Sequence, residues 1–199
     1  MIPGRLSRAI AAARRALLAG LTAAAVACGG SGHEEAIVPP GPADAAAVPA
    51  TPPVPLVAHE RLGALLPDAP DGWTRGGFRT AALTLPAPAT HATATYTRGA
   101  IRADLAITDT AGQQEFLEAT LSVAGTDFDQ QASNGYQKGT TVAGFPAIES
   151  WNHQDHLGEF TVVVNRRFLV FATATDLPDI ATLRALVDRV DFRAIAALK

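Results

Sequence analysis

The chain has 199 residues, of which 48% are hydrophobic, and a formal net charge of −3 at pH 7. This length leaves room for one domain of ordinary size. Residues 1–27 contain four of the 16 Lys and Arg residues and none of the 19 Asp and Glu residues, so the chain without them would carry about −7. Such an acidic chain lacks the basic surface that binds phosphate backbones, and we expect no nucleic-acid partner.

Residues 1–27 combine a basic start with an uncharged apolar run, ALLAGLTAAAVA. This order is typical of a secretory signal peptide, and the run is shorter than the roughly 20 residues that a membrane-spanning helix needs. The only cysteine, Cys28, follows directly in the tetrapeptide Ala-Val-Ala-Cys. This tetrapeptide resembles the lipobox of bacterial lipoproteins, in which cleavage leaves the cysteine as an acylated N-terminus. The resemblance implies a lipid anchor at Cys28. With Gly29 next to it, the resemblance also implies sorting to the periplasmic face of the outer membrane.

Residues 28–55 hold seven of the fourteen prolines and no aromatic residue. A segment of this composition buries too little apolar surface to fold, so we expect a disordered, Pro- and Ala-rich tether. Extended Pro-rich chain rises about 3.1 Å per residue, which gives an upper reach on the order of 80 Å. The alternative is that the segment itself binds a partner, but no PxxP stretch is flanked by a basic anchor.

Residues 56–199 are expected to form a single domain that begins with antiparallel strands. In Ile101–Thr108 apolar residues alternate with polar ones, which predicts a strand with one wet face. The threonine-rich stretch 92–98 precedes it across Gly99-Ala100 and completes a hairpin. Asn165-Arg166 suits a tight turn. Further strands are expected at 145–151, 160–164 and 168–175, the last apolar on both faces and therefore central in the sheet.

Two main helices are expected, at 113–124 and 176–190. In the second, Asp176 suits the N-cap and Pro178 falls in the first turn. Asp191 is expected to cap a short final helix. An apolar stripe at helical spacing would pack 176–190 on the sheet: Ile180, Leu183, Val187 and Val190. The predicted fold class is therefore α+β, an antiparallel β-sheet with two main helices packed on one face.

The order of these elements, with the segments GFPAIESW, VVVNRRFLVFATAT and LPDIATLRALVDRVDF, resembles the MOG1/PsbP-like α+β fold. It also resembles a set of bacterial lipoproteins whose domain opens with a stretch like Leu66–Trp73. The similarity covers roughly residues 65–198 and rests on turn and core positions. It implies a fold, carries over no catalytic residue, and says little about activity, because members of this fold bind proteins, assist photosystem assembly or have no assigned role.

The stretch WNHQDHLGEF at 151–160 gathers His153, Asp155, His156 and Glu159. Two imidazoles and two carboxylates could complete a zinc set, or form a pH-responsive site. Spacing within a loop between two strands does not by itself bring ligands together, however. We interpret the stretch as a polar connection, with Gly158 supplying the turn, and expect no cofactor.

Other chemical-looking residues have simpler interpretations. Lys138–Thr141 has the residue types of a phosphate-binding loop in the wrong order and is expected to be a polar turn. Asp127 and Asp129 are expected to be solvated turn residues. Trp73 and Trp151 could form a ligand floor, but core packing accounts for such residues more often.

Two functions remain open at this point. The first is a membrane-anchored lipoprotein of the cell envelope that acts as a non-catalytic binding or assembly module for a protein partner. It is motivated by the anchor at Cys28, the tether, and the lack of a nucleophile elbow, Walker A loop or HExxH motif in the sequence. The alternative is a weak metal-binding protein or metal-dependent hydrolase that uses the His153/His156 loop.

Overall fold

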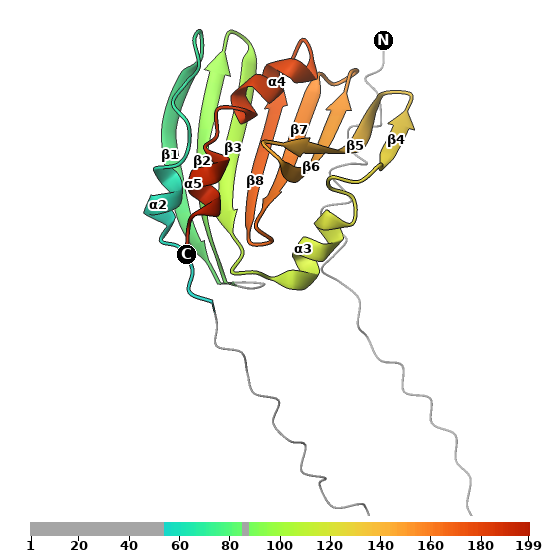
Figure 1. Cartoon of the computed structure of the whole chain (residues 1–199). Helices are drawn as coiled ribbons and strands as arrows, with labels where there is room; N and C mark the ends of the chain where they lie inside the picture. The colour runs from blue at the N-terminus through green and yellow to red at the C-terminus, as the bar shows by residue number, and fades with distance from the viewer. Residues whose placement is uncertain (1–53, 85–87) are drawn as a thin grey trace, which may run out of the picture. The chain divides into compact units, whose positions relative to one another are not determined.

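The computed structural model describes residues 54–84 and 88–199. The predicted signal peptide, Cys28 and nearly all of the predicted tether lie outside the described residues. Within them the chain forms these strands: β1 Thr74–Leu83, β2 Ala89–Arg98, β3 Ile101–Asp109, β4 Asp129–Ala132, β5 Gly135–Val142, β6 Phe145–Asn152, β7 Leu157–Val164 and β8 Phe168–Thr175. They make one eight-stranded antiparallel sheet in the order β1-β2-β3-β8-β7-β6-β5-β4 (Figure 1).

The described helices are short: α2 His59–Gly63, α3 Gln114–Leu121, α4 Ile180–Val187 and α5 Phe192–Ala196. Among the described residues, no helix has the length and apolar character needed to cross a membrane. Figure 1 shows α2, α4 and α5 on the same side of the sheet. Alternate residues of the central strands point to that side and form the buried core, among them Tyr96, Leu105, Phe160 and Val170.

The prediction of an α+β fold with two main helices packed on one face was wrong. The molecule is one large antiparallel sheet, and its longest described helices, α3 and α4, have eight residues each. Three strands that were not predicted, β1, β4 and β5, add to the sheet. The predicted helix 176–190 begins later because Asp176 has a left-handed backbone, with φ of 58°. The N-cap is Asp179 instead, whose Oδ1 accepts a hydrogen bond from the Thr182 amide at 2.9 Å.

The helices also lie on both faces of the sheet. Gly158 of β7 faces α4, because a Cβ placed there would lie 3.3 Å from Leu183. Gly139 of β5 instead faces the segment after α3, where its Cβ would lie 2.4 Å from the Thr126 carbonyl oxygen. Through the pairing of β5, β6 and β7, Gly139 shares its face of the sheet with Thr161 of β7. Thr161 is three residues from Gly158, and side chains alternate between faces along a strand, so the two glycines point to opposite faces.

Several strand-level predictions are confirmed. The 92–98 and Ile101–Thr108 stretches pair as a hairpin, and β8 lies in the middle of the sheet. Asn165 and Arg166 form the tight turn between β7 and β8, with φ of 51° and 52°. Asp191 caps α5 through the Ala194 amide at 2.9 Å. These features were predictable because each depends on local sequence pattern or turn chemistry.

The start of the described chain is fixed to the sheet by a buried ion pair. Asp109 is fully buried and accepts hydrogen bonds from the Val57 amide at 2.8 Å and from Arg167 Nε and Nη2 at 2.9 and 2.8 Å. Arg167 also donates to the Pro55 carbonyl oxygen, and Thr90 donates to that of Val57. Burial alone would raise the pKa of Asp109, but the hydrogen bonds, with that from Arg167 the largest, hold it below its ordinary value.

Candidate binding site beside the edge strand

Strand β1 forms one edge of the sheet. It pairs only with β2, and a bulge between Arg75 and Phe78 places Gly76-Gly77 outside the regular register. From Phe78 to Leu83 the pairing with β2 is continuous. In an edge strand, alternate N–H and C=O groups point away from the sheet and are free to pair with another chain. No described strand lies beyond β1 (Figure 1).

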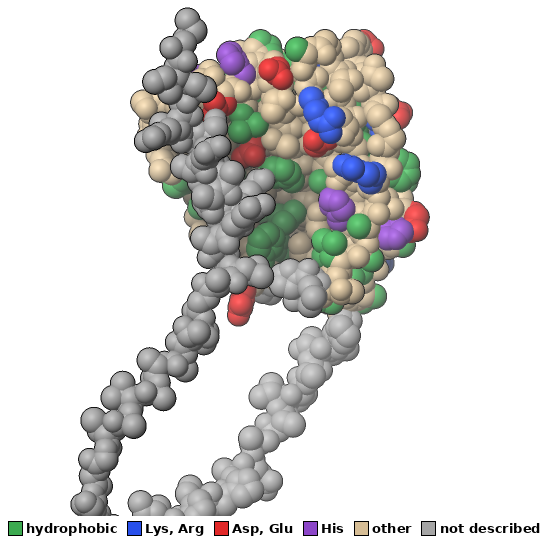
Figure 2. Space-filling model, turned by 180° about the vertical axis from the view of Figure 1, so that it is seen from behind, with side chains coloured by type: hydrophobic (Ala, Val, Ile, Leu, Met, Phe, Trp, Pro, Cys, Tyr) green, Lys and Arg blue, Asp and Glu red, His purple; other side chains and the backbone are tan. Residues whose placement is uncertain are grey.

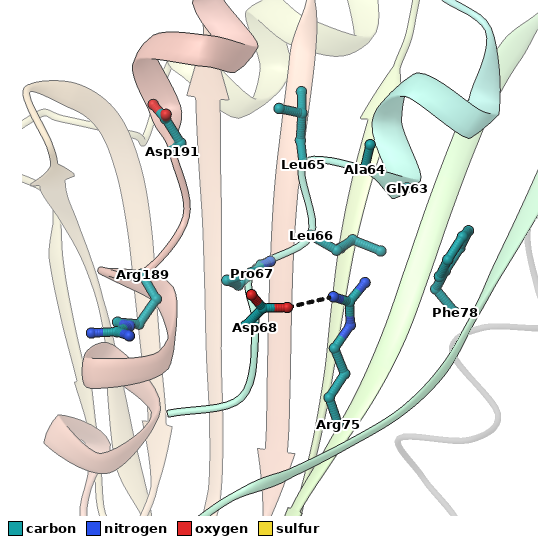
Figure 3. A pocket seen from close by; sticks show the side chains of 10 residues that line it. All are labelled: Gly63, Ala64, Leu65, Leu66, Pro67, Asp68, Arg75, Phe78, Arg189 and Asp191. Atoms are coloured by element: carbon teal, nitrogen blue, oxygen red, sulfur yellow. Dashed lines mark hydrogen bonds and ion pairs between the residues drawn. The ribbon is translucent and has the colours of Figure 1, made fainter. Parts of the chain in front are cut away.

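A cavity of about 450 Å³ lies next to this edge. It is bounded by residues 63–68, which include and follow the end of α2, by Arg75 and Phe78 of β1, and by Arg189 and Asp191 ahead of α5 (Figure 3). Segments far apart in the sequence therefore build one hollow on the face that α2, α4 and α5 cover.

Close packing holds the wall of the cavity in place. A Cβ at Gly63 would lie only 2.7 Å from the Phe78 ring, so glycine lets the end of α2 approach β1. The Tyr96 hydroxyl donates to the Pro67 carbonyl oxygen at 2.7 Å. Burial of this tyrosine is the main reason that its pKa is raised to about 12. The hydroxyl therefore stays protonated, and remains a donor, at neutral pH.

The charges at the cavity are two arginines and two aspartates. Arg75 Nη1 lies 3.4 Å from Asp68 Oδ1, and the Asp68 side chain is fully exposed while that of Arg75 is 21% exposed. Asp191 is already engaged as the N-cap of α5. Within the described chain no carboxylate pairs with Arg189. An exposed pair at this distance contributes little, so the Arg75 guanidinium is available to an acidic group that enters the cavity.

The next arginine of β1, Arg79, points to the opposite face, because it directly follows Phe78 in a regular part of the strand. Figure 2 shows this face, with charged and histidine side chains scattered over it and hydrophobic side chains gathered in patches. Arg79 stands opposite Thr93 in the register, next to the pair Ala81 and His91. Partial burial and then the charge of Arg79 lower the pKa of His91. In the described part of the chain Arg79 has no ion-pair partner, so its charge is uncompensated.

The histidine stretch forms the turn between β6 and β7. His153, Asp155 and His156 are exposed, and Glu159 lies within β7. His156 Nδ1 is 2.9 Å from the Leu177 carbonyl oxygen, and Asp155 Oδ2 accepts from the Asn152 side-chain Nδ2 at 2.8 Å. Among the described residues, no group of three or more His, Cys, Asp or Glu side chains is placed to hold a metal ion.

The turn itself is built differently from the prediction. Gly158 does not supply it: the left-handed residue is His156, with φ of 50°. Gly158 is buried in β7, where the missing side chain admits Leu177 and Ile180 from the start of α4. The prediction that Lys138–Thr141 is a polar turn was also wrong, because these residues lie inside β5.

Lys138 instead belongs to a network around the buried Glu149 that the sequence did not indicate. Its Nζ lies 3.1 Å from Glu149 Oε1, and the Tyr136 hydroxyl donates to the same oxygen. Burial and then Glu149 raise the pKa of Tyr136. Glu149 therefore has two partners, Lys138 and Tyr136, at the same carboxylate oxygen. Asp127 and Asp129 are both exposed, as predicted, but Asp129 lies in β4 and not in a turn.

The two tryptophans lie at the edge of the hydrophobic core and do not form one ligand-binding surface. Trp73, just before β1, and Trp151, in β6, are partly buried against the core and are separated by the width of the central sheet. Arg98 stacks over the Trp73 ring at 4.9 Å. Sequence reasoning missed Arg75, Phe78 and Arg189. The one local signal was the pair Gly76-Gly77, which is unusual inside a strand.

No protein-family model, no curated protein and no solved structure matches this chain.

Proposed function

We propose that this chain is a lipid-anchored protein of the bacterial cell envelope, held at the periplasmic face of the outer membrane, whose domain binds another protein. The anchor would be Cys28, and residues 28–55 would carry the domain away from the lipid surface. Each methylene of an acyl chain that is buried in the membrane contributes about 0.8 kcal/mol to the free energy of membrane binding. Several acyl chains on Cys28 would therefore give stable attachment.

The observation that carries the binding role is the juxtaposition of an open sheet edge with a cavity. Strand β1 leaves one row of backbone groups unpaired in the described chain, and the cavity of about 450 Å³ opens beside it. Phe78 sits at their junction with 52% of its surface exposed, unlike most large apolar residues. An exposed aromatic at the border of a pocket and an open edge is typical of a protein-binding surface.

Site-specific cross-linking in intact cells tests this proposal. Phe78→benzoylphenylalanine places a photo-reactive group at the site, and Phe116→benzoylphenylalanine provides the matched control, because Phe116 of α3 is 55% exposed and lies on another part of the domain. We expect a discrete envelope-protein adduct from position 78 and none from position 116. Equal labelling from both positions, or none from position 78, would contradict a binding role for this site.

A further inference from the structure

The open edge of β1 is suited to one kind of partner. A free row of alternating N–H and C=O groups is completed by an extended chain, which adds a strand to the sheet and gains main-chain hydrogen bonds. The regular part, Phe78–Leu83, is six residues long, about the length of a typical strand. The other edge strand, β4, has only four residues, so β1 is the longer template.

Arginines stand on both faces of this edge. Arg75, on the cavity face, pairs with the exposed Asp68 at 3.4 Å and lies over the Phe78 ring at 5.8 Å, and Arg189 also lines the cavity. Arg79 points to the opposite face and has no ion-pair partner in the described chain. Successive residues of an added strand also point to opposite faces, so acidic residues at neighbouring positions would meet arginines on both sides.

A second copy of this chain is a poorer fit than an acidic partner. Antiparallel pairing of two β1 strands centred on Thr80 would bring the two Arg79 side chains to one face as diagonal neighbours, about 7–8 Å apart. Two arginines at this separation on one exposed face repel each other, most strongly at low salt. Small side chains at Thr80, Ala81 and Ala82 leave room for a neighbouring strand, so charge rather than bulk selects the partner.

We propose that an extended acidic segment of a partner protein adds to the sheet along β1 as a further strand, with one side chain entering the cavity. This inference rests on the proposed function and specifies the partner of the same site. Phe78 and Leu83, 52% and 46% exposed, are the large apolar side chains that such a strand would cover.

Hydrogen exchange with a synthetic peptide tests the inference. The full-length protein in detergent is incubated with millimolar acetyl-Thr-Val-Glu-Glu-Val-Thr-amide, whose adjacent glutamates reach both faces, or with the matched peptide carrying two lysines. We expect the glutamate peptide to slow exchange of the outward-pointing amides between Phe78 and Leu83, and the lysine peptide to have no effect. Arg79→Glu should weaken binding of the glutamate peptide about fivefold.

Arg102→Glu is the control for net charge, since Arg102 lies two strands in from the edge and its side chain is 58% exposed. It should change peptide affinity less than twofold. Equal protection by both peptides, no protection by either, or concentration-dependent protection of β1 without peptide would overturn the inference. If position 78 still cross-links a partner in cells under those outcomes, the proposed function stands and only strand addition fails.

Discussion

At the scale of single residues, one ion pair fixes the start of the domain, and one arginine that is unpaired in the described chain is the proposed recognition group. Asp109 and Arg167 tie Pro55 and Val57 to the sheet, so the chain enters the domain at a fixed point. Arg79 carries an uncompensated charge at the edge of β1. We expect the Asp109–Arg167 pair to support stability and Arg79 to support recognition, and each role can be tested separately.

Asp109→Asn should lower the free energy of unfolding by about 3–5 kcal/mol, because it leaves the mostly buried Arg167 without its counter-charge. In the native protein the lowered pKa of Asp109 contributes stability that is complete above the ordinary carboxyl value of 3.8 and is lost as the pH falls through the lower folded value. Urea denaturation at pH 7 and in acid measures both effects. An Asn variant as stable as the native protein at pH 7 would contradict this role.

Arg79→Glu should raise the pKa of His91, because it replaces a cation that disfavours the imidazolium with an anion that favours it. An NMR titration of the histidine ring signals measures the direction. Arg102→Glu, at the far end of β3 from the position that pairs with His91, should leave that pKa unchanged. A His91 pKa that stays the same in Arg79→Glu would mean that Arg79 does not point toward it.

At the scale of secondary structure, the elements that sequence predicted are those with a local signature. Ile101–Thr108 alternates because one face is buried and the other is wet. Strand β1, TRGGFRTAAL, shows no such pattern because it is mostly exposed on both faces. Gly139 looked like a turn residue, yet it lies in β5 where the Thr126 carbonyl oxygen needs the space of a side chain. Strand pairing and contacts with distant segments, which local pattern does not encode, decided these cases.

The contact between α4 and β7 gives a test at this scale. Gly158→Val should lower the free energy of unfolding by about 1–3 kcal/mol, because even a Cβ would lie 2.7 and 2.8 Å from Leu177 and Ile180. These are flexible side-chain ends, so the helix can shift without unfolding the domain. Gly77→Val is the matched control, since nothing lies within 4 Å of a Cβ there, and it should change stability by less than about 0.5 kcal/mol. Thermal denaturation compares the two variants.

At the scale of the whole molecule, the sequence predicted the location of the protein in the cell, and the fold provided the candidate binding site. The predicted signal peptide, Cys28 and the predicted tether are adjacent in sequence, and the sequence pattern was therefore enough to propose them. The candidate site was not visible as such a pattern, because Arg75 and Arg189 line one cavity only once β1 and the segment before α5 are folded together. The same holds for the open edge, which depends on the order of strands rather than on any one of them.

Cys28→Ala should release the protein from the membrane fraction, because the acyl chains that anchor it can no longer be attached. Ultracentrifugation of lysed cells, followed by immunoblotting, measures the partition. Replacing the neighbouring residue in Gly30→Ala should leave the protein in the membrane fraction. A Cys28→Ala variant that sediments with membranes as fully as the native protein would contradict a lipid anchor at this residue.

The most direct test of a tethered module that binds through β1 is photo-cross-linking from position 78 in intact cells, with and without Arg79→Glu. We expect one envelope-protein adduct from Phe78→benzoylphenylalanine, mapped by mass spectrometry to an acidic extended segment, and a clear loss of that adduct when Arg79→Glu is added. The account would be contradicted by no adduct, by an adduct on a second copy of this chain, or by an adduct whose yield is unchanged by Arg79→Glu.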